Sequence, residues 1–186
     1  MQPALAAGSE SETEDPVERA QELIEYGHSA QARELLLQTL QQRPNDEPVY
    51  TLLGQACANL GHWEEAEQWC RQAVSLNRLA LRAYYTLGLV LQHQGKLDNA
   101  IDAMRKVVYL DHTSVLGHFG LADLYRCKEQ FPQALKSLDN ARRLLSTRAQ
   151  EELIPDSGGI TAGRLRQTVI RQQQQWEVEA SRRSAG

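Results

Sequence analysis

The sequence predicts an all-α fold in which a helix–turn–helix unit is repeated about four times. The first observation is a period of 34 residues, which brings four alanines into one column: Ala32, Ala66, Ala100 and Ala134. The second is the spacing of apolar residues within each unit, three, four and seven positions apart, as on one face of an α-helix. The third is composition, because aromatic residues make up only 6% of the chain. A period of this length is typical of stacked repeats, in which each unit buries its apolar face against its neighbours.

Each unit is expected to hold two helices. The second helix has a clear apolar face, formed in the second unit by Trp63, Ala66, Cys70 and Ala73. The pattern places helices over about 16–26, 29–42, 47–60, 63–76, 81–94, 97–110, 115–128 and 131–145. These helices form units of about 13–46, 47–80, 81–114 and 115–148, which together make an array over residues 16–148.

Glycine recurs at two positions of the unit, each with a structural reason. Gly61 and Gly95 follow the first helix of their units, where we expect a left-handed C-terminal residue. Gly54 and Gly88 fall in the middle of a helix, where glycine costs about 0.5–1 kcal/mol relative to alanine. We interpret this repeated cost as a close approach of the second helix, and we expect the alanines of the 34-residue column to be its partners.

A further helix is expected over residues 161–180, at the end of the array. Thr161 is suited to cap its N-terminus, and spacings of four and seven give it an apolar face of Leu165, Val169 and Trp176. Repeat arrays need a terminal cap with a polar outer side, so we interpret this helix as the cap. The alternative is that Trp176 and Ile170 dock on a partner or on a second copy of the chain.

The remaining segments are expected to be connections and tails. Residues 149–160 form a linker that contains Pro155 and two glycines. Residues 1–15 are acidic and lack Lys and Arg, and they are expected to be a flexible tail. Residues 181–186 are expected to be flexible as well.

Charge and composition narrow the classes of partner. The net charge of -4 is matched by four acidic residues within 1–15, so the rest of the chain is neutral. It therefore lacks the basic surface that nucleic acid requires. No apolar run approaches the ~18–20 residues needed to span a membrane, and the N-terminus lacks the pattern of a signal peptide. Three cysteines without a CxxC spacing favour reduced thiols and a cytoplasmic location.

No arrangement typical of catalysis or metal binding is present in the sequence. No two histidines have i, i+4 spacing on one helix face, and Ser157 lacks the G-x-S-x-G context of a hydrolytic nucleophile. We therefore expect no enzyme activity, no catalytic residue, no cofactor and no metal. Cys57 and Cys70 are expected to pack against each other as small apolar side chains, with a reversible disulfide as the alternative.

The repeat resembles the tetratricopeptide repeat, whose pattern runs W-x2-L-G-x2-Y, then A-x3-F, then P. The second unit reads Y-x2-L-G-x2-C from Tyr50 and A-x3-C from Ala66. The third reads Y-x2-L-G-x2-L from Tyr84 and A-x3-M from Ala100. The resemblance covers residues 13–148, with the first unit the most degenerate. It implies a right-handed superhelical array that offers a concave groove to a peptide or helix of a partner protein.

In that family the first helix of each unit lines the groove. By this resemblance the groove residues are Gln55, Asn59, Arg82, Tyr85, Leu89, Gln92, Phe119, Asp123 and Arg126. Aromatic residues and arginine tend to dominate binding energy; the alternative for Tyr85 and Phe119 is that they fill space between units. One variant of the family clamps a C-terminal carboxylate. Its matching positions here hold one cation only, so no such clamp is expected: Val17, Gln21, Leu52, Arg82 and Thr86.

The C-terminal region carries a second resemblance. Residues 152–170 contain the sequence IPDSGGITAGRLRQ, which is similar to the region after the repeats in bacterial chemoreceptor glutamate methyltransferases of the CheR type. This implies a regulatory tail that helps an enzyme domain outside this chain to select a chemoreceptor. No alternating strand and helix pattern for an S-adenosylmethionine site is present. The competing hypothesis is an assembly adaptor that forms a homodimer through the C-terminal helix.

Overall fold

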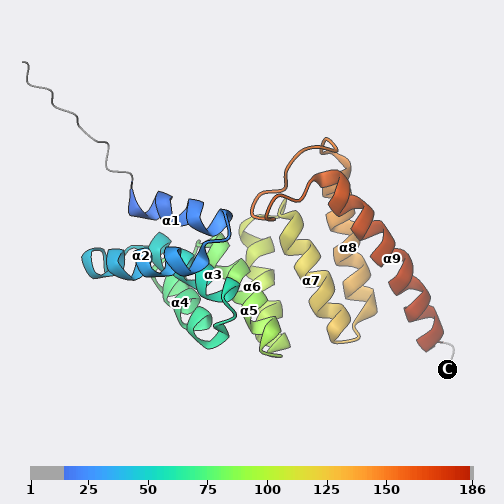
Figure 1. Cartoon of the computed structure of the whole chain (residues 1–186). Coiled ribbons are helices and arrows are strands. Elements are labelled where there is room, and N and C mark those ends of the chain that lie inside the picture. The colour runs from blue at the N-terminus through green and yellow to red at the C-terminus, as the bar shows by residue number, and fades with distance from the viewer. Residues whose placement is uncertain (1–14, 185–186) are drawn as a thin grey trace, which may run out of the picture.

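A computed structural model describes residues 15–184 of the chain, and within that range the fold is all-helical. The helices lie close to their expected bounds, because helix periodicity is a local property of the sequence. They are α1 (Pro16–Glu25), α2 (Ser29–Gln42), α3 (Glu47–Asn59), α4 (Trp63–Leu76), α5 (Leu81–His93), α6 (Leu97–Leu110), α7 (Val115–Cys127), α8 (Phe131–Ser146) and α9 (Ala162–Ser184). Figure 1 shows them stacked from α1 at one end to α9 at the other.

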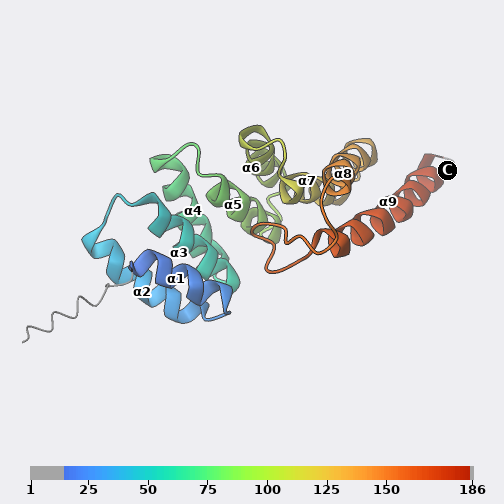
Figure 2. The ribbon, with the colours of Figure 1, turned by 90° about the horizontal axis from the view of Figure 1, so that it is seen from above.

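The helices form pairs that stack in one direction (Figures 1 and 2). Within a unit the first helix packs on the second, and the second packs on the first helix of the next unit. The first helices of adjacent units also touch, α1 with α3, α3 with α5 and α5 with α7. They therefore line one continuous side of the array. α9 packs on α8 at the end of the array.

Each first helix ends in the same hydrogen-bonded turn. In the second unit the N–H of Gly61 donates to the carbonyl of Ala58 (3.0 Å), and the N–H of His62 donates to the carbonyl of Cys57 (2.9 Å). This is the Schellman motif, whose central residue takes a left-handed conformation. The expected role of the turn glycines is confirmed, and the fourth unit uses a glutamate in their place. The φ angles are 83° at Gly27, 76° at Gly61, 74° at Gly95 and 59° at Glu129.

The mid-helix glycines mark close helix contacts, but the expected partners were wrong in part. A Cβ atom at Gly54 would collide with the Sγ of Cys70, and one at Gly88 would lie 2.9 Å from the Cε of Met104. The alanines of the 34-residue column are fully buried. The side chain that meets each glycine belongs instead to the residue four positions after the alanine. The larger Cys and Met side chains reach across to the glycine, whereas an alanine methyl group is too short to do so.

The first unit is formed despite its degenerate sequence. Ala20, Ala32 and Leu36 are fully buried in a core cluster shared with α3. Asp15 accepts a hydrogen bond from the N–H of Val17 (3.1 Å) and so caps α1. The expectation of a flexible tail was therefore wrong for Asp15, because its carboxylate satisfies a free N–H of the first turn. The rest of that expected tail, residues 1–14, lies outside the described residues.

The C-terminal helix closes the main core as a cap. Leu165, Val169 and Trp176 are all buried against α8 and its neighbours, with Trp176 only 2% exposed, so the capping role is confirmed. Docking of Trp176 on a partner was wrong, because its ring is already enclosed. Residues 181–184 were expected to be flexible, but α9 continues through Ser184; residues 185–186 lie outside the described range.

Candidate peptide-binding groove

The predicted groove residues of the third and fourth units lie along two neighbouring helices. On α5 and on α7 they recur at spacings of three, four and seven, so each set forms one stripe of its helix. Because α5 contacts α7, the two stripes lie side by side on the face formed by the first helices. The α5 stripe is Arg82, Tyr85, Leu89 and Gln92, and the α7 stripe is Phe119, Asp123 and Arg126.

The second unit contributes less to this surface than the sequence suggested. Gln55 occupies the matching stripe of α3 and is half-buried. Asn59 is one position off that stripe, at the end of α3, and its amide donates to the Oγ of Ser29 in the preceding unit (3.1 Å). The residue 34 positions later, His93, stacks on Trp63 with ring centroids 4.1 Å apart. Both side chains thus hold consecutive units together.

Arg82 is held from two sides. Its Nη2 pairs with the Oδ1 of Asp156 at 2.8 Å, and its Nη1 donates to the Oε1 of Gln21 in α1 at 3.3 Å. Gln21 and Arg82 are two of the five positions that correspond to a carboxylate clamp in the related family. Here the guanidinium bonds to groups of its own chain, including an acidic residue from the segment between α8 and α9.

Tyr85 and Asp123 form the centre of the groove surface. Burial, together with the nearby charges of Asp156 and Asp123, raises the pKa of Tyr85 to about 12. Burial also raises the pKa of Asp123 above its usual value, an effect that the charge of Arg126 opposes. The Tyr85 hydroxyl therefore stays protonated near neutral pH and is available as a hydrogen-bond donor.

The end of the groove on α7 meets the C-terminal helix. The guanidinium carbon of Arg126 lies 5.8 Å from the centre of the Trp176 ring, a cation–π geometry. Tyr85 and Phe119 are half-buried and pack against the main core. They fill space between units, as the alternative proposed, while part of each ring remains accessible.

Comparisons with known proteins agree with this architecture. Two sequence profiles described as tetratricopeptide repeat match residues 23–88 and residues 81–113. The chain contains tetratricopeptide repeats. The crystal structure of MamA matches with a TM-score of 0.66 and 23% identity, over 71% of this chain and 77% of that one.

Further MamA structures resemble the tetratricopeptide array in the same way. A second crystal structure of MamA gives a TM-score of 0.65 at 24% identity, over 74% of this chain and 75% of that one. The MamA RS-1 ArsTM double mutant gives 0.65 at 18% identity, over 92% and 97%. At such identities the likeness shows the fold alone. No curated protein matches the sequence.

The segment between α8 and α9, residues 147–161, adds groove residues that the sequence reasoning missed. We call it the α8–α9 loop. Together with the tetratricopeptide array it lines a partly open cavity of about 90 Å³. From the loop, the lining includes Ile154, Pro155 and Asp156, and from the array it includes Arg82 and Tyr85. The only sequence signal was Asp156 within the mostly apolar and glycine-rich stretch 153–160, which by itself does not identify a contact.

The described residues contain neither a metal-binding cluster nor a membrane-spanning helix. Within residues 15–184, no group of three or more His, Cys, Asp or Glu side chains is placed to hold a metal ion. In the same range no helix is both long enough and apolar enough to cross a membrane. Cys57, Cys70 and Cys127 are free thiols, so the disulfide alternative is not realised in this structure.

Proposed function

We propose that the chain is a non-catalytic module that binds a peptide or helix of a partner protein along the α5 and α7 stripes. The observation that carries this proposal is the mixed character of that surface. Tyr85, Leu89 and Phe119 offer apolar contact, while Gln92 and Arg126 offer hydrogen-bond donors. Because the helices that carry these side chains are already rigid, little conformational entropy is lost by the groove on binding.

A selection of peptides from a displayed random library tests this proposal. Peptides selected on the full chain should bind a Tyr85→Ala, Phe119→Ala double variant at least ~10-fold more weakly, since hot-spot aromatics carry most of such energies. Tyr109→Ala serves as the matched control, because Tyr109 is an exposed aromatic on α6. Circular dichroism checks that the double variant is folded. If the selected peptides bind the double variant as well as they bind the full chain, but bind Tyr109→Ala more weakly, the binding surface lies on another face of the array.

The more specific proposal is that this module is the regulatory tail of a bacterial chemoreceptor methyltransferase system in the cytoplasm. Its support is the resemblance of residues 152–170 stated above, together with an array suited to binding proteins. Pull-down with chemoreceptor cytoplasmic fragments tests it directly. Enrichment on the full chain and not on the Tyr85→Ala, Phe119→Ala variant is the expected result. Equal recovery on both, or none on either, would remove the chemoreceptor from consideration.

The second candidate function is assembly through α9. Ile170 and Val178, eight residues apart on one face of α9, are 41% and 52% exposed, although the opposite face of the helix is buried. A second copy of the chain is the proposed occupant of this face. Light scattering of the full chain against an Ile170→Ser, Val178→Ser variant tests it. A dimer that becomes a monomer supports assembly, and a monomer in both cases excludes it.

A further inference from the structure

The α8–α9 loop folds back onto the groove face of the array. Figures 1 and 2 show it leaving α8, reaching toward α5 and returning to α9. Asp156 near its tip pairs with Arg82 of α5 at 2.8 Å. Ile154 is only 4% exposed and lines the same cavity as Tyr85. A carboxylate and an apolar side chain from the loop thus occupy part of the surface proposed to bind a partner.

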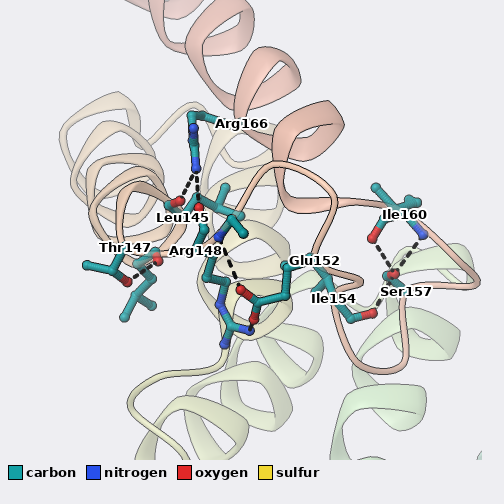
Figure 3. A network of polar contacts seen from close by, with 10 residues as sticks. Leu145, Thr147, Arg148, Glu152, Ile154, Ser157, Ile160 and Arg166 are labelled. Carbon is teal, nitrogen blue, oxygen red and sulfur yellow. Dashed lines mark hydrogen bonds and ion pairs between the residues drawn. The ribbon is translucent and has the colours of Figure 1, made fainter.

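The base of the loop is fixed to the end of the array. Figure 3 shows the Arg166 guanidinium bonded to the carbonyls of Leu145 and Arg148, and Arg148 paired with Glu152 at 2.6 Å. The N–H of Ala162 donates to the carbonyl of Glu152 at 2.7 Å, which starts α9. None of these bonds involves α5, so movement of the tip leaves the base in place.

The tip is held in shape by its own hydrogen bonds. Ser157 donates from its hydroxyl to the carbonyl of Ile154 (2.6 Å) and accepts from the N–H of Ile160 (3.0 Å), as Figure 3 shows. The N–H of Ile154 donates to the carbonyl of Ile160 (3.0 Å). These bonds stabilise the loop conformation from within the loop, in the manner of a compact Ω-loop, and Ile154 is in addition buried in the main core.

The packing beneath the tip of the loop is incomplete, and the ion pair that joins the tip to the groove is partly exposed to solvent. A cavity remains beneath the loop, so packing there falls short of a protein interior. The side chains of Arg82 and Asp156 are 36% and 37% exposed, and ion pairs in water contribute little to stability. Asp156 also has a φ of 57°, a left-handed conformation that aspartate and asparagine adopt more readily than other residues with a Cβ. These features describe a contact that another molecule can replace.

We propose that the α8–α9 loop is an intramolecular competitor for the groove, and that the segment which displaces it is acidic. Such a segment presents a carboxylate to Arg82 and an apolar side chain to the cavity beside Tyr85, as the loop does. This inference rests on the proposed groove function. Because the loop is tethered, its effective concentration is high, so the apparent affinity for any partner falls in proportion to the fraction of molecules in which the loop is open.

A blocked peptide with the sequence of residues 152–160 serves as the probe, labelled for fluorescence anisotropy. It is compared with a version in which Asp156 is replaced by Asn. The proteins are the full chain, an Asp156→Asn variant, the same variant with Arg82→Gln, and a Glu151→Gln control that removes an exposed acid of the same loop. Asparagine tolerates the left-handed backbone, so the Asp156→Asn variant alters charge while keeping the loop conformation.

The Asp156→Asn variant should bind the acidic peptide at least ~10-fold more tightly than the full chain or the Glu151→Gln control, as release of a tethered competitor requires. The Asn peptide should bind that variant at least ~5-fold more weakly, and Arg82→Gln should abolish the difference between the peptides. In the full chain, saturating peptide should also speed hydrogen exchange at the amide of Ile154, because displacement of the tip exposes the bond that this amide donates to the carbonyl of Ile160.

Equal affinity for the full chain and the Asp156→Asn variant would overturn the competitor, and equal affinity for both peptides would overturn the acidic preference. Absence of binding to every protein would overturn both. If the peptide fails while library-selected peptides still depend on Tyr85 and Phe119, the loop inference fails and the groove function stands. If the library-selected peptides also ignore those residues, the groove function itself fails.

Discussion

At the scale of the residue, the clearest irregularity is Glu129. It takes the left-handed conformation that glycine takes in the three earlier units, and it forms an exposed ion pair with Arg183 of α9. A side chain with a Cβ is disfavoured in this conformation. The fourth unit thus keeps the turn geometry of the other units with some backbone strain at Glu129. The glutamate side chain in turn provides an ion pair to α9.

Glu129→Gly should raise the melting temperature by about 2–4 °C, the shift expected for relief of backbone strain in a chain of this size. Glu129→Ala is the matched control, because it removes the same ion pair and keeps the strained Cβ. Thermal unfolding followed by circular dichroism measures both. A Gly variant no more stable than the Ala variant would show that the left-handed turn carries no cost here.

The cysteines should differ sharply in reactivity. Burial raises the pKa of Cys57 to about 11, with a further contribution from the charge of Glu65, and burial raises the pKa of Cys70 to about 12. Because the thiolate is the nucleophile, both thiols should stay unreactive at pH 8. Cys127 is exposed. A thiol reagent should therefore label one cysteine per native chain and three per denatured chain; rapid labelling of two or more native thiols would contradict this.

At the scale of the element, the spacing between α3 and α4 depends on Gly54 and Cys70. Gly54→Ala should lower the free energy of unfolding by about 1–3 kcal/mol, as overpacking does, because the new methyl group meets the Cys70 sulfur. Adding Cys70→Ala should restore most of that loss by making room. Urea unfolding of the two single variants and the double variant measures the coupling. Additive effects would mean that the two side chains do not compete for one space.

Gly120→Ala supplies a comparison at a contact between consecutive units, α7 against α6. A Cβ there would meet the Cε of Met104 at 3.1 Å, but the thioether is flexible and can move aside. Its effect should therefore be smaller than that of Gly54→Ala.

An ion pair joins the second helices of the first two units, α2 and α4. Glu65 of α4 pairs with Arg33 of α2 at 2.7 Å and accepts a bond from the Nε1 of Trp69. Burial alone would raise the pKa of Glu65, but the bonds from Arg33 and Trp69 outweigh it and hold the pKa below its usual value. A lowered folded pKa contributes stability above the unfolded pKa of about 4.3, and this is lost as pH falls through the folded value.

Glu65→Gln should consequently lower the free energy of unfolding at pH 7 by about 0.5–1 kcal/mol. The difference from the unchanged chain should shrink as pH falls below about 4, where both carry a neutral side chain. Urea unfolding at a series of pH values measures it. A difference that is independent of pH would assign the effect to packing and not to charge.

At the scale of the whole molecule, the array has one-dimensional connectivity. Each helix contacts mainly its neighbours along the stack, so a local perturbation should stay local. Trp176 provides the test, because its ring closes the core at the α9 end and lies beneath Arg126.

Trp176→Ala should cost about 3–5 kcal/mol in that part of the molecule, as loss of a buried large aromatic does. Hydrogen exchange should become faster in α7, α8 and α9 and remain unchanged in α1 and α2, because those helices share no contact with the altered core. A uniform increase along the chain would show instead that the units unfold as a single cooperative body.

The sequence by itself determined the helices, the 34-residue period, the glycine turns and the apolar face of α9. The period is seen by comparing the units with one another, and each of the other features depends on residues within about one or two helical turns. It also placed Tyr85, Phe119 and their neighbours on one face, since equal spacing on repeated helices gives equal positions in the stack.

Only the tertiary structure decided what those side chains meet. Cys70 and Met104, not the column alanines, approach the mid-helix glycines, because side-chain length across a helix contact is not expressed in periodicity. Asp156 reaches Arg82 because a loop without any repeating pattern reverses the chain over the groove. Contacts of this kind depend on where a segment without a repeating pattern packs on the surface of the array. That surface forms only when the units stack.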